Sequence, residues 1–281
     1  MSIFPLNHDL HCHPYLYSVD VNDEKMSVES VLNFAKTAGY KRVCFVPHFW
    51  DEDVPIPSND KWLTDYLKKE SFKHIGGMLP LPIDDEVQLL FGCEAEFYGC
   101  DKLSVSPKRY GHFDMMVISL VHYFYDFVRP DKYKDPEKHG EILLMQLEGF
   151  VEMDLPWRKV GVAHLNFDGA VWQRDDVREF RDAMFNSFTE LPEGRLRSVF
   201  SKLAKYGAGI ELNAGGFYQG WDSDNKKAGQ LHLFKTAKEA GCKFYCGSDA
   251  HNYNELALDN LYGIVDLLGL TSDDMFIPVQ D

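Results

Sequence analysis

The feature that most constrains the fold of this chain is a regular alternation of apolar, strand-like segments with helix-like segments. Seven segments have the length and apolar character of a buried strand: "NHDLHCH", "KRVCFVPH", "QLLFGCEAEF", "FDMMVISLVH", "KVGVAHLN", "GAGIELNAGG" and "CKFYCGSDAH". Strands that alternate with helices form parallel sheets with right-handed crossovers. At 281 residues and 45% hydrophobic content, the chain is long enough to bury the core of one α/β barrel.

Two further observations favour a closed barrel in one domain. The chain carries no nucleotide-binding glycine fingerprint, so seven strands favour a barrel over an open doubly wound sheet. It also contains no low-complexity segment, no Gly/Ser linker and no repeat at a fixed short period. The sequence therefore predicts an α/β fold, a (β/α)7 TIM-like barrel, as a single domain over residues 1–281.

The helix-like segments have recognisable ends. In "SVESVLNFAKTAGY", Ser27 is a plausible N-cap and Gly39 a stop signal. The other expected helices lie near residues 138–153, 174–187, 193–206, 228–240 and 252–268.

Three connections are longer than usual for a βα loop. They cover residues 49–60, 123–137 and 215–228, and each follows a predicted strand. Long loops in compact domains often bind ligands or cover a site. Loops that follow strands lie on the C-terminal face of a barrel, where barrel enzymes keep their active sites.

Every predicted strand ends in a side chain that can bind a metal ion or a substrate. His11 and His13 project from the same face of the first strand, because side chains two residues apart on a strand point the same way, and Asp20 follows in the loop. The later strands end in His48, in Glu94 and Glu96, in His122, in His164, in Glu211 and Asn213, and in Asp249 and His251. Imidazole and carboxylate are the ligands that Zn, Mn and Fe share. Since a barrel brings all strand ends to one rim, the sequence predicts a metal site there.

Each of these residues has an ordinary structural explanation when taken alone. Histidine is a common half-buried residue, and a glutamate at a strand end is often exposed or paired with a base. The coincidence at seven strand ends is what favours a metal site. The other histidines provide a contrast, and we expect structural or surface roles for His8, His74, His112, His139 and His232. Asp9 shares the face of His11 and is expected to orient a ligand imidazole.

The net charge limits the classes of partner, and the cysteines and apolar runs bear on the cellular location. The net charge of −15 disfavours long nucleic acids and anionic membranes, although bound metal ions still allow a small phosphorylated substrate. The six cysteines are scattered and most lie in apolar segments, as expected of reduced, buried thiols. No signal peptide and no membrane-spanning apolar run is recognisable, so a cytoplasmic location is expected.

Taken in order, the motifs resemble those of a known superfamily. "DLHCH", the strand-ending "PH", "GCEAEF", "SLVHY", "AHLN" and "GSDAH" resemble the motifs of the PHP (polymerase and histidinol phosphatase) superfamily over nearly the whole chain. The chain looks most like the stand-alone histidinol-phosphate phosphatases. The resemblance implies a distorted seven-stranded barrel with two to three divalent transition metals (Zn, Mn or Fe) at its C-terminal face.

The resemblance also implies ligand sets and a reaction. The sets are His11, His13, Glu94 and Asp249 for one metal; Glu94, His122 and His164 for a second; and Asp20, His48 and His251 for a third. Glu94, Asp249 and His251 are the implied catalytic residues. The implied activity is hydrolysis of a phosphate monoester, with L-histidinol phosphate as the favoured substrate, by a hydroxide that the metals generate at neutral pH.

The chain departs from the resembled family where the phosphate should be held. Basic residues typical after the fifth-strand histidine and the sixth-strand "ELN" are missing, and Arg174 is the first base after the former. Aromatic residues stand there instead, namely Trp172, Phe217, Tyr218 and Trp221. Arg174, Glu211 and Asn213 are the expected substrate contacts.

Three other functions stay open at this point. One is a phosphodiesterase or nucleotide phosphatase of the same superfamily. Another is an amidohydrolase-type barrel, although such enzymes tend to use a fourth-strand lysine where this chain has His122. The last is a noncatalytic metal-binding module, which would be expected to have lost ligands, and none of the nine is missing. The sequence leaves the oligomeric state open.

Overall fold

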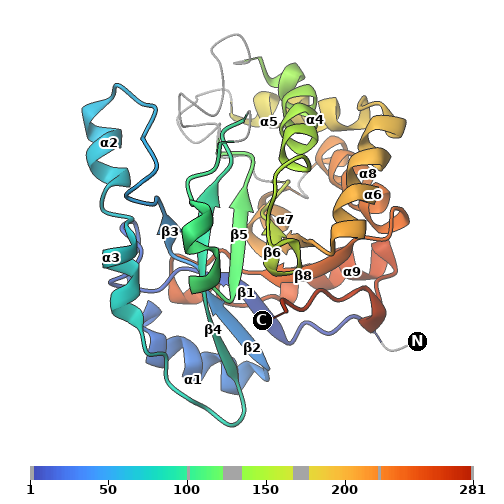
Figure 1. Ribbon diagram of the computed structural model, residues 1–281. Coiled ribbons are helices and arrows are strands. Elements are labelled where there is room, and N and C mark those ends of the chain that lie inside the picture. The colour runs from blue at the N-terminus through green and yellow to red at the C-terminus, as the bar shows by residue number, and fades with distance from the viewer. Residues whose placement is uncertain (1–2, 100–101, 123–134, 167–176, 221–222, 280–281) are drawn as a thin grey trace.

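The computed structural model describes residues 3–99, 102–122, 135–166, 177–220 and 223–279 (Figure 1). Within these residues, eight strands form one sheet in which every pairing is parallel. The strands are β1 (His8–Cys12), β2 (Arg42–Phe45), β3 (His48–Phe49), β4 (Gln88–Glu96), β5 (Met115–Ser119), β6 (Val160–Val162), β7 (Gly209–Asn213) and β8 (Lys243–Gly247). Their order is β1-β2-β4-β5-β6-β7-β8, and β3 pairs with β4.

The second predicted strand is split into β2 and β3. Pro47, which has no N–H to donate, lies in the break, and its carbonyl accepts a hydrogen bond from the Glu94 amide at 2.9 Å. Beyond the break, His48 is in register with Glu94 on β4. The split therefore brings the end of one predicted strand beside the middle of the candidate site.

The sheet nearly closes on itself between its first and last strands. The Asp249 amide donates to the His11 carbonyl at 2.7 Å, and the His13 amide donates to the Ala250 carbonyl at 3.1 Å. These hydrogen bonds form just past the end of β8, so the seam between β1 and β8 lies at the C-terminal rim. The predicted distorted (β/α)7 TIM-like barrel is confirmed.

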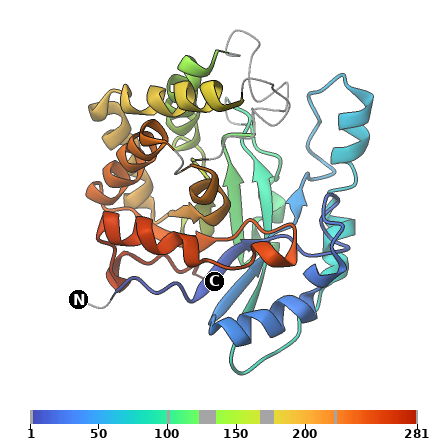
Figure 2. The ribbon, with the colours of Figure 1, turned by 180° about the vertical axis from the view of Figure 1, so that it is seen from behind.

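Helices surround the strands, as Figures 1 and 2 show. They are α1 (Val28–Ala38), α2 (Lys61–Leu67), α3 (Phe72–Ile75), α4 (His139–Phe150), α5 (Val177–Thr189), α6 (Glu193–Tyr206), α7 (Ala214–Gly220), α8 (Asp224–Glu239) and α9 (Tyr262–Leu268). The predicted ends of α1 are confirmed, because the Ser27 hydroxyl accepts from the Ser30 amide and Gly39 is left-handed with φ 77°. In the described ranges, no helix has both the length and the apolar character needed to cross a membrane.

Two helical regions differ from the prediction. Residues 215–228, expected as a loop, are largely helical, because α7 and the start of α8 fall there. The glycines of "AGGFYQG" lower helix propensity, but buried Phe217 packs on Phe234 and the Asn213 side chain accepts from the Gly216 amide. Helices α2 and α3 were not predicted. Residues 49–60 do connect β3 to α2, and most of the expected 123–137 loop lies outside the described residues.

Two buried clusters make up the core. A small one fills the inside of the barrel with alternate residues of the strands, among them Cys44, Leu90, Met115 and Tyr245. A larger one packs the outer faces of the strands against the helices. The five described cysteines are buried free thiols, as predicted. Gly161 makes room inside the barrel, because a Cβ there would lie 2.5 Å from the Tyr245 hydroxyl oxygen.

Replacing Gly161 with alanine should therefore destabilise the barrel. Overpacking of a filled core typically costs about 1–3 kcal/mol, and we expect the free energy of unfolding of Gly161→Ala to fall by about that amount. Gly194 on α6 is the matched control, since a Cβ there meets nothing within 4 Å and alanine favours a helix. Urea denaturation measures both variants. Equal loss of stability in the two would contradict the packing described here.

Candidate metal centre

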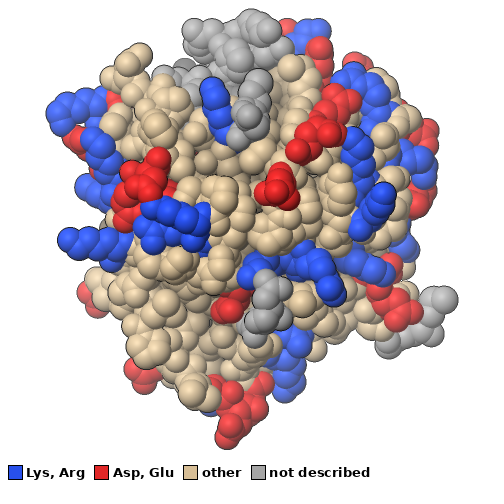
Figure 3. All heavy atoms as spheres, viewed as in Figure 1, with Lys and Arg blue, Asp and Glu red and all other residues tan. Residues whose placement is uncertain are grey.

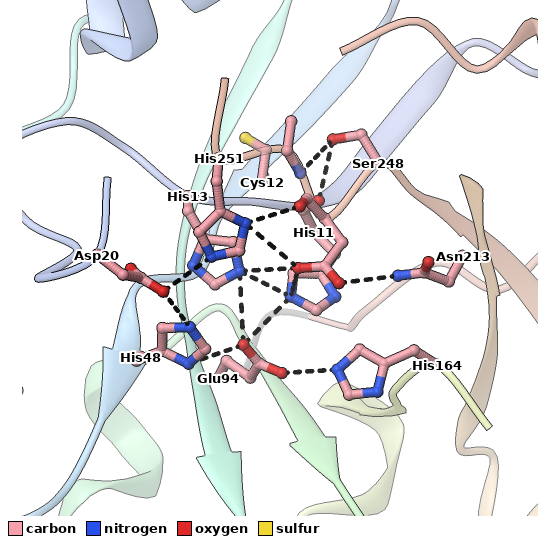
Figure 4. Close-up of polar contacts among 12 residues, drawn as sticks. His11, Cys12, His13, Asp20, His48, Glu94, His164, Asn213, Ser248 and His251 are labelled. Atoms are coloured by element: carbon pink, nitrogen blue, oxygen red, sulfur yellow. Dashed lines mark hydrogen bonds and ion pairs between the residues drawn. The ribbon is translucent and has the colours of Figure 1, made fainter. Parts of the chain in front are cut away.

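The candidate ligands converge on the C-terminal rim of the barrel (Figure 4). Each lies near or shortly past the C-terminal end of a strand, apart from His48, which begins the two-residue β3, and Asp20, which lies in the connection after β1. The residues brought together are His11, His13, Asp20, His48, Glu94, His122, His164, Asp249 and His251. The cluster is graded in exposure. The side chains of His11 and Glu94 are at most 1% exposed, whereas those of Asp20 and His251 are 32% and 30% exposed.

Glu94 lies at the centre of the cluster. Its carboxylate oxygens face five imidazole nitrogens: on Oε2, His48 Nδ1 at 3.0 Å, His13 Nε2 at 3.4 Å and His11 Nε2 at 3.5 Å; on Oε1, His164 Nε2 at 2.8 Å and His122 Nε2 at 3.6 Å. Although three nitrogens surround Oε2, it forms no hydrogen bond of acceptable geometry within the described part of the chain. A buried carboxylate oxygen in this position is suited to a cation.

The first group of donor atoms has the spacing of a metal coordination shell. It consists of His11, His13, Glu94 and Asp249. His13 Nε2 lies 3.2 Å from His11 Nε2 and 3.1 Å from Asp249 Oδ1, and His11 Nε2 lies 3.5 Å from Asp249 Oδ1. Ligand atoms around a tetrahedral zinc ion, with bonds of roughly 2.0–2.1 Å, are separated by about 3.3–3.4 Å. The four side chains therefore fit a divalent cation.

A second group also matches the expected set. Its donors, from Glu94, His122 and His164, lie within 4.8 Å of one another. Glu94 thus contributes one oxygen to each group.

The third expected set is only partly reproduced. Asp20 Oδ2 lies between two imidazoles, 3.2 Å from His48 Nε2 and 3.0 Å from His251 Nε2. The group of three whose donors all lie within 4.8 Å joins His48 and His251 to His13, not to Asp20. The His13 ring stacks on both, with ring centroids 4.1 Å from His251 and 4.6 Å from His48.

The carboxylates of the cluster are held in their ionised form. Burial by itself would raise the pKa of Glu94, but the neighbouring His48 and His11 lower it well below its ordinary value. The pKa of Asp249 is lowered in the same way, with His11 and His13 outweighing burial. Such carboxylates are anionic throughout the physiological range and attract cations.

The pKa values of the imidazoles in the cluster shift in two directions. Burial lowers the pKa of His11, but Glu211, Asp249 and Glu94 more than offset it, so that the pKa is raised well above its ordinary value. The pKa of His48 is likewise raised, because Asp20 and Glu94 outweigh burial. His13 differs, since burial and its neighbours His251 and His48 lower its pKa to about 3. His13 is therefore a neutral imidazole, the form that binds a metal.

Two buried glutamates contact imidazoles of the cluster on the side away from its centre. Glu96 Oε1 lies 2.5 Å from His122 Nδ1, and Glu211 Oε1 lies 2.9 Å from His11 Nδ1. A carboxylate on the remote nitrogen fixes the ring and the tautomer of a metal-binding histidine. For Glu96, which lies on the same strand face as Glu94, the sequence left open whether it is a surface residue, a partner of a ligand or an acid/base group.

Glu211 and Asn213 lie beneath the cluster, where a substrate would not reach them directly. Both are at most 1% exposed. Glu211 Oε2 accepts from the His164 amide at 2.6 Å, and the Asn213 side chain donates to Asp249 Oδ2 at 3.2 Å. His164 and Asp249 are non-glycine residues with positive φ, 24° and 55°. Strained backbone of this kind persists where surrounding contacts hold it, and it is common at functional sites.

The remaining predicted residues fall elsewhere. Asp9 holds the backbone rather than a ring: its carboxylate accepts from the backbone amides of His11 and Ser248 and from the Ser248 hydroxyl, so it joins β1 to the end of β8. His8 is buried outside the cluster and accepts from the Cys246 amide. Arg174, Trp172 and Trp221 lie outside the described residues, as does the side chain of Tyr218.

Comparison with known proteins shows a shared fold. No family model matches the chain, and no curated protein sequence does. Among solved structures, the chain is similar to the histidinol phosphate phosphatase from Lactococcus lactis subsp. lactis Il1403, which was crystallised with zinc, L-histidinol and phosphate. The TM-score is 0.51 at 15% sequence identity, over 96% of this chain and 98% of that one. The comparison therefore shows that this chain shares the fold of that phosphatase.

Removing the charge of Glu211 should weaken metal binding while leaving the barrel folded. Glu211→Gln keeps the size of the side chain but no longer places a carboxylate on His11, and loss of such a partner typically costs about 10–100-fold in metal affinity. Competition against a chromophoric chelator measures the affinity for Zn²⁺. Glu152→Gln, in an exposed ion pair with Lys202, is the control and should bind as the unchanged protein does. Unaltered affinity in Glu211→Gln would show that His11 needs no such support.

Proposed function

We propose that this protein is a metal-dependent phosphatase that hydrolyses a phosphate monoester of a small metabolite. The observation that carries the proposal is the position of Glu94, a buried carboxylate whose two oxygens belong to two different groups of metal-binding donors. A shared carboxylate of this kind suits a centre with more than one metal ion, and paired metal ions suit hydrolysis of phosphate esters. The fold shared with a zinc-containing phosphatase supports the same reaction class.

We infer that two to three divalent cations bind to these residues. His11, His13, Glu94 and Asp249 would hold one; Glu94, His122 and His164 a second; and His48 and His251, with Asp20 or His13, a third. The mixture of imidazole and carboxylate donors fits Zn, Mn or Fe, and it lacks the all-oxygen shell that Ca²⁺ and Mg²⁺ prefer. When bound, such cations lower the pKa of water and neutralise phosphoryl oxygens.

The residues of the chain position these ions and leave one side open. The Asp249 carbonyl accepts from His251 Nδ1 at 2.9 Å, so Nε2 of that ring is the nitrogen turned toward Asp20 and the centre. Asp20 and His251 are the most exposed of the candidate ligands, so a substrate would enter past them. Glu94 lies at the closed end, where water is excluded and its charge is little screened.

L-Histidinol phosphate is the first substrate to test, because both the motifs and the similar solved structure point to it. A phosphodiester activity is the main alternative, and a phosphodiester such as bis(p-nitrophenyl) phosphate distinguishes it. An amidohydrolase activity would leave both phosphate substrates unchanged. A noncatalytic module would bind metal and hydrolyse nothing.

Exchange of Glu94 for glutamine tests the proposal most directly. Glu94→Gln keeps the shape of the side chain but removes the charge shared by two groups, so we expect the loss of at least one metal per chain. Hydrolysis of p-nitrophenyl phosphate should fall by at least about 100-fold, since even partners of ligands contribute about 10–100-fold. Elemental analysis and phosphate release are measured on the same samples, and circular dichroism monitors folding.

Glu141→Gln is the matched control, because Glu141 is an exposed residue of α4 whose ion pair is with Lys138. It should keep the metal content and turnover of the unchanged protein. The proposal fails if Glu94→Gln retains full turnover, or if metal-supplemented protein contains no transition metal.

Metal binding should release protons and strengthen as pH rises. Without metal, the raised pKa values of His11 and His48 keep these imidazoles protonated through neutrality, and a metal binds only the deprotonated ring. The protons must therefore leave, and the apparent affinity for Zn²⁺ should increase with pH from about 6 to 8. Calorimetric titration in two buffers of different ionisation enthalpy counts the protons. An affinity independent of pH over this range would contradict the assignment.

A further inference from the structure

A cleft of about 670 Å³ lies between residues that follow β1 and residues that follow β3. One wall contains Ser18, Val19 and Val21, and the opposite wall contains Lys69, Lys73 and His74. The first wall belongs to the connection after β1 and the second to the connection after β3, so both follow the C-terminal ends of strands. Substrate-binding residues of barrel enzymes come from such connections.

The two walls are joined to each other and to the metal centre. The Tyr17 hydroxyl donates to the Gly77 carbonyl at 3.1 Å, and seen from behind, the segment between β1 and α1 lies beside α3 (Figure 2). Val19 and Val21 flank Asp20, which contacts His48 and His251. The cleft therefore begins beside Asp20, which belongs to the more exposed side of the centre.

The charge of the cleft is opposite to that of the molecule. The protein carries a net charge of −15, yet the described residues that line the cleft include Lys69, Lys73 and His74 and no Asp or Glu. Among the described residues, neither lysine ammonium takes part in an ion pair. Basic side chains lie along the edge of the molecule formed by α2 and α3 (Figure 3). This is a local site for an anionic group.

A buried hydroxyl in the wall of the cleft lacks a partner. Ser18 is 4% exposed, and in the described part of the chain its Oγ forms no hydrogen bond. Buried polar atoms of folded proteins are nearly always paired, so an unpaired hydroxyl that lines a cleft indicates a ligand atom that would pair with it. Val19 and Val21 add apolar surface beside it.

We propose that this cleft binds the end of the substrate remote from the phosphate, and that this end carries a second anionic group, a carboxylate or a second phosphate. The inference rests on the proposed function and specifies its substrate class. Lys69 and Lys73 attract the anion, Ser18 Oγ hydrogen-bonds to it, and the valines contact the apolar part. A cationic alcohol portion, such as the protonated amine of L-histidinol, would be repelled by the same lysines.

Matched esters test this with the metal-loaded full-length protein. We expect kcat/KM for 4-carboxyphenyl phosphate to exceed that for phenyl phosphate by about tenfold, since exposed charge pairs contribute modestly and two lysines act together. In Lys69→Gln/Lys73→Gln the preference should fall to about one, and in Ser18→Ala it should fall in part, through KM rather than kcat.

Lys68→Gln is the control, because Lys68 neighbours the cleft in sequence but does not line it. It should keep the tenfold preference. A preference retained in the double variant, or absent from the unchanged protein, overturns the proposal. Calorimetric titration with (4-carboxybenzyl)phosphonate and benzylphosphonate tests the anion-binding cleft independently of the phosphatase activity. If none of the esters is hydrolysed but the carboxylate strengthens binding through Lys69 and Lys73, the cleft assignment stands and the phosphatase assignment fails.

Discussion

The contact between the buried Glu94 carboxylate and the imidazoles around it is the interaction on which this structure depends. A carboxylate taken out of water costs several kcal/mol unless opposite charge and hydrogen-bond donors surround it. Here imidazoles from β1, β3 and the ends of β5 and β6 surround it, and a barrel is the arrangement that delivers side chains from so many strands to one point. The barrel is therefore what allows a carboxylate to be buried at this position.

Residues of β7 hold the side chains and backbone of the cluster in place. Glu211 reaches both the His11 ring and the His164 amide, and Asn213 holds Asp249, so β7 organises residues from three other strands. The space for Glu211 is provided by Gly247 on β8, where a Cβ would lie 1.9 Å from Glu211 Oε1. A residue without a side chain is thus needed at a position that itself touches no metal.

The sequence predicted the strands and most residues of the candidate cluster because those signals are local. An apolar run that ends in polar residues predicts both a strand and the place where it ends. In a parallel sheet, the C-terminal ends of the strands lie on a common rim. The failures concern contacts between distant segments. Packing of Phe217 on Phe234 makes α7 helical against its glycines, Asp9 finds Ser248 rather than an imidazole, and Glu211 faces inward to His11. Contacts between distant segments leave no periodic pattern in the sequence from which they could be predicted.

The seam of the barrel has a consequence for how the protein holds together. The hydrogen bonds that join β1 to the end of β8 are made by the backbones of His11, His13 and Asp249, whose side chains meet in the first group of donors. An ion bound there would cross-link the two ends of the sheet in the way that a disulfide joins two distant parts of a chain. Opening of the barrel and release of the ion would then be one event, so that metal supply in the surroundings would set the lifetime of the folded state.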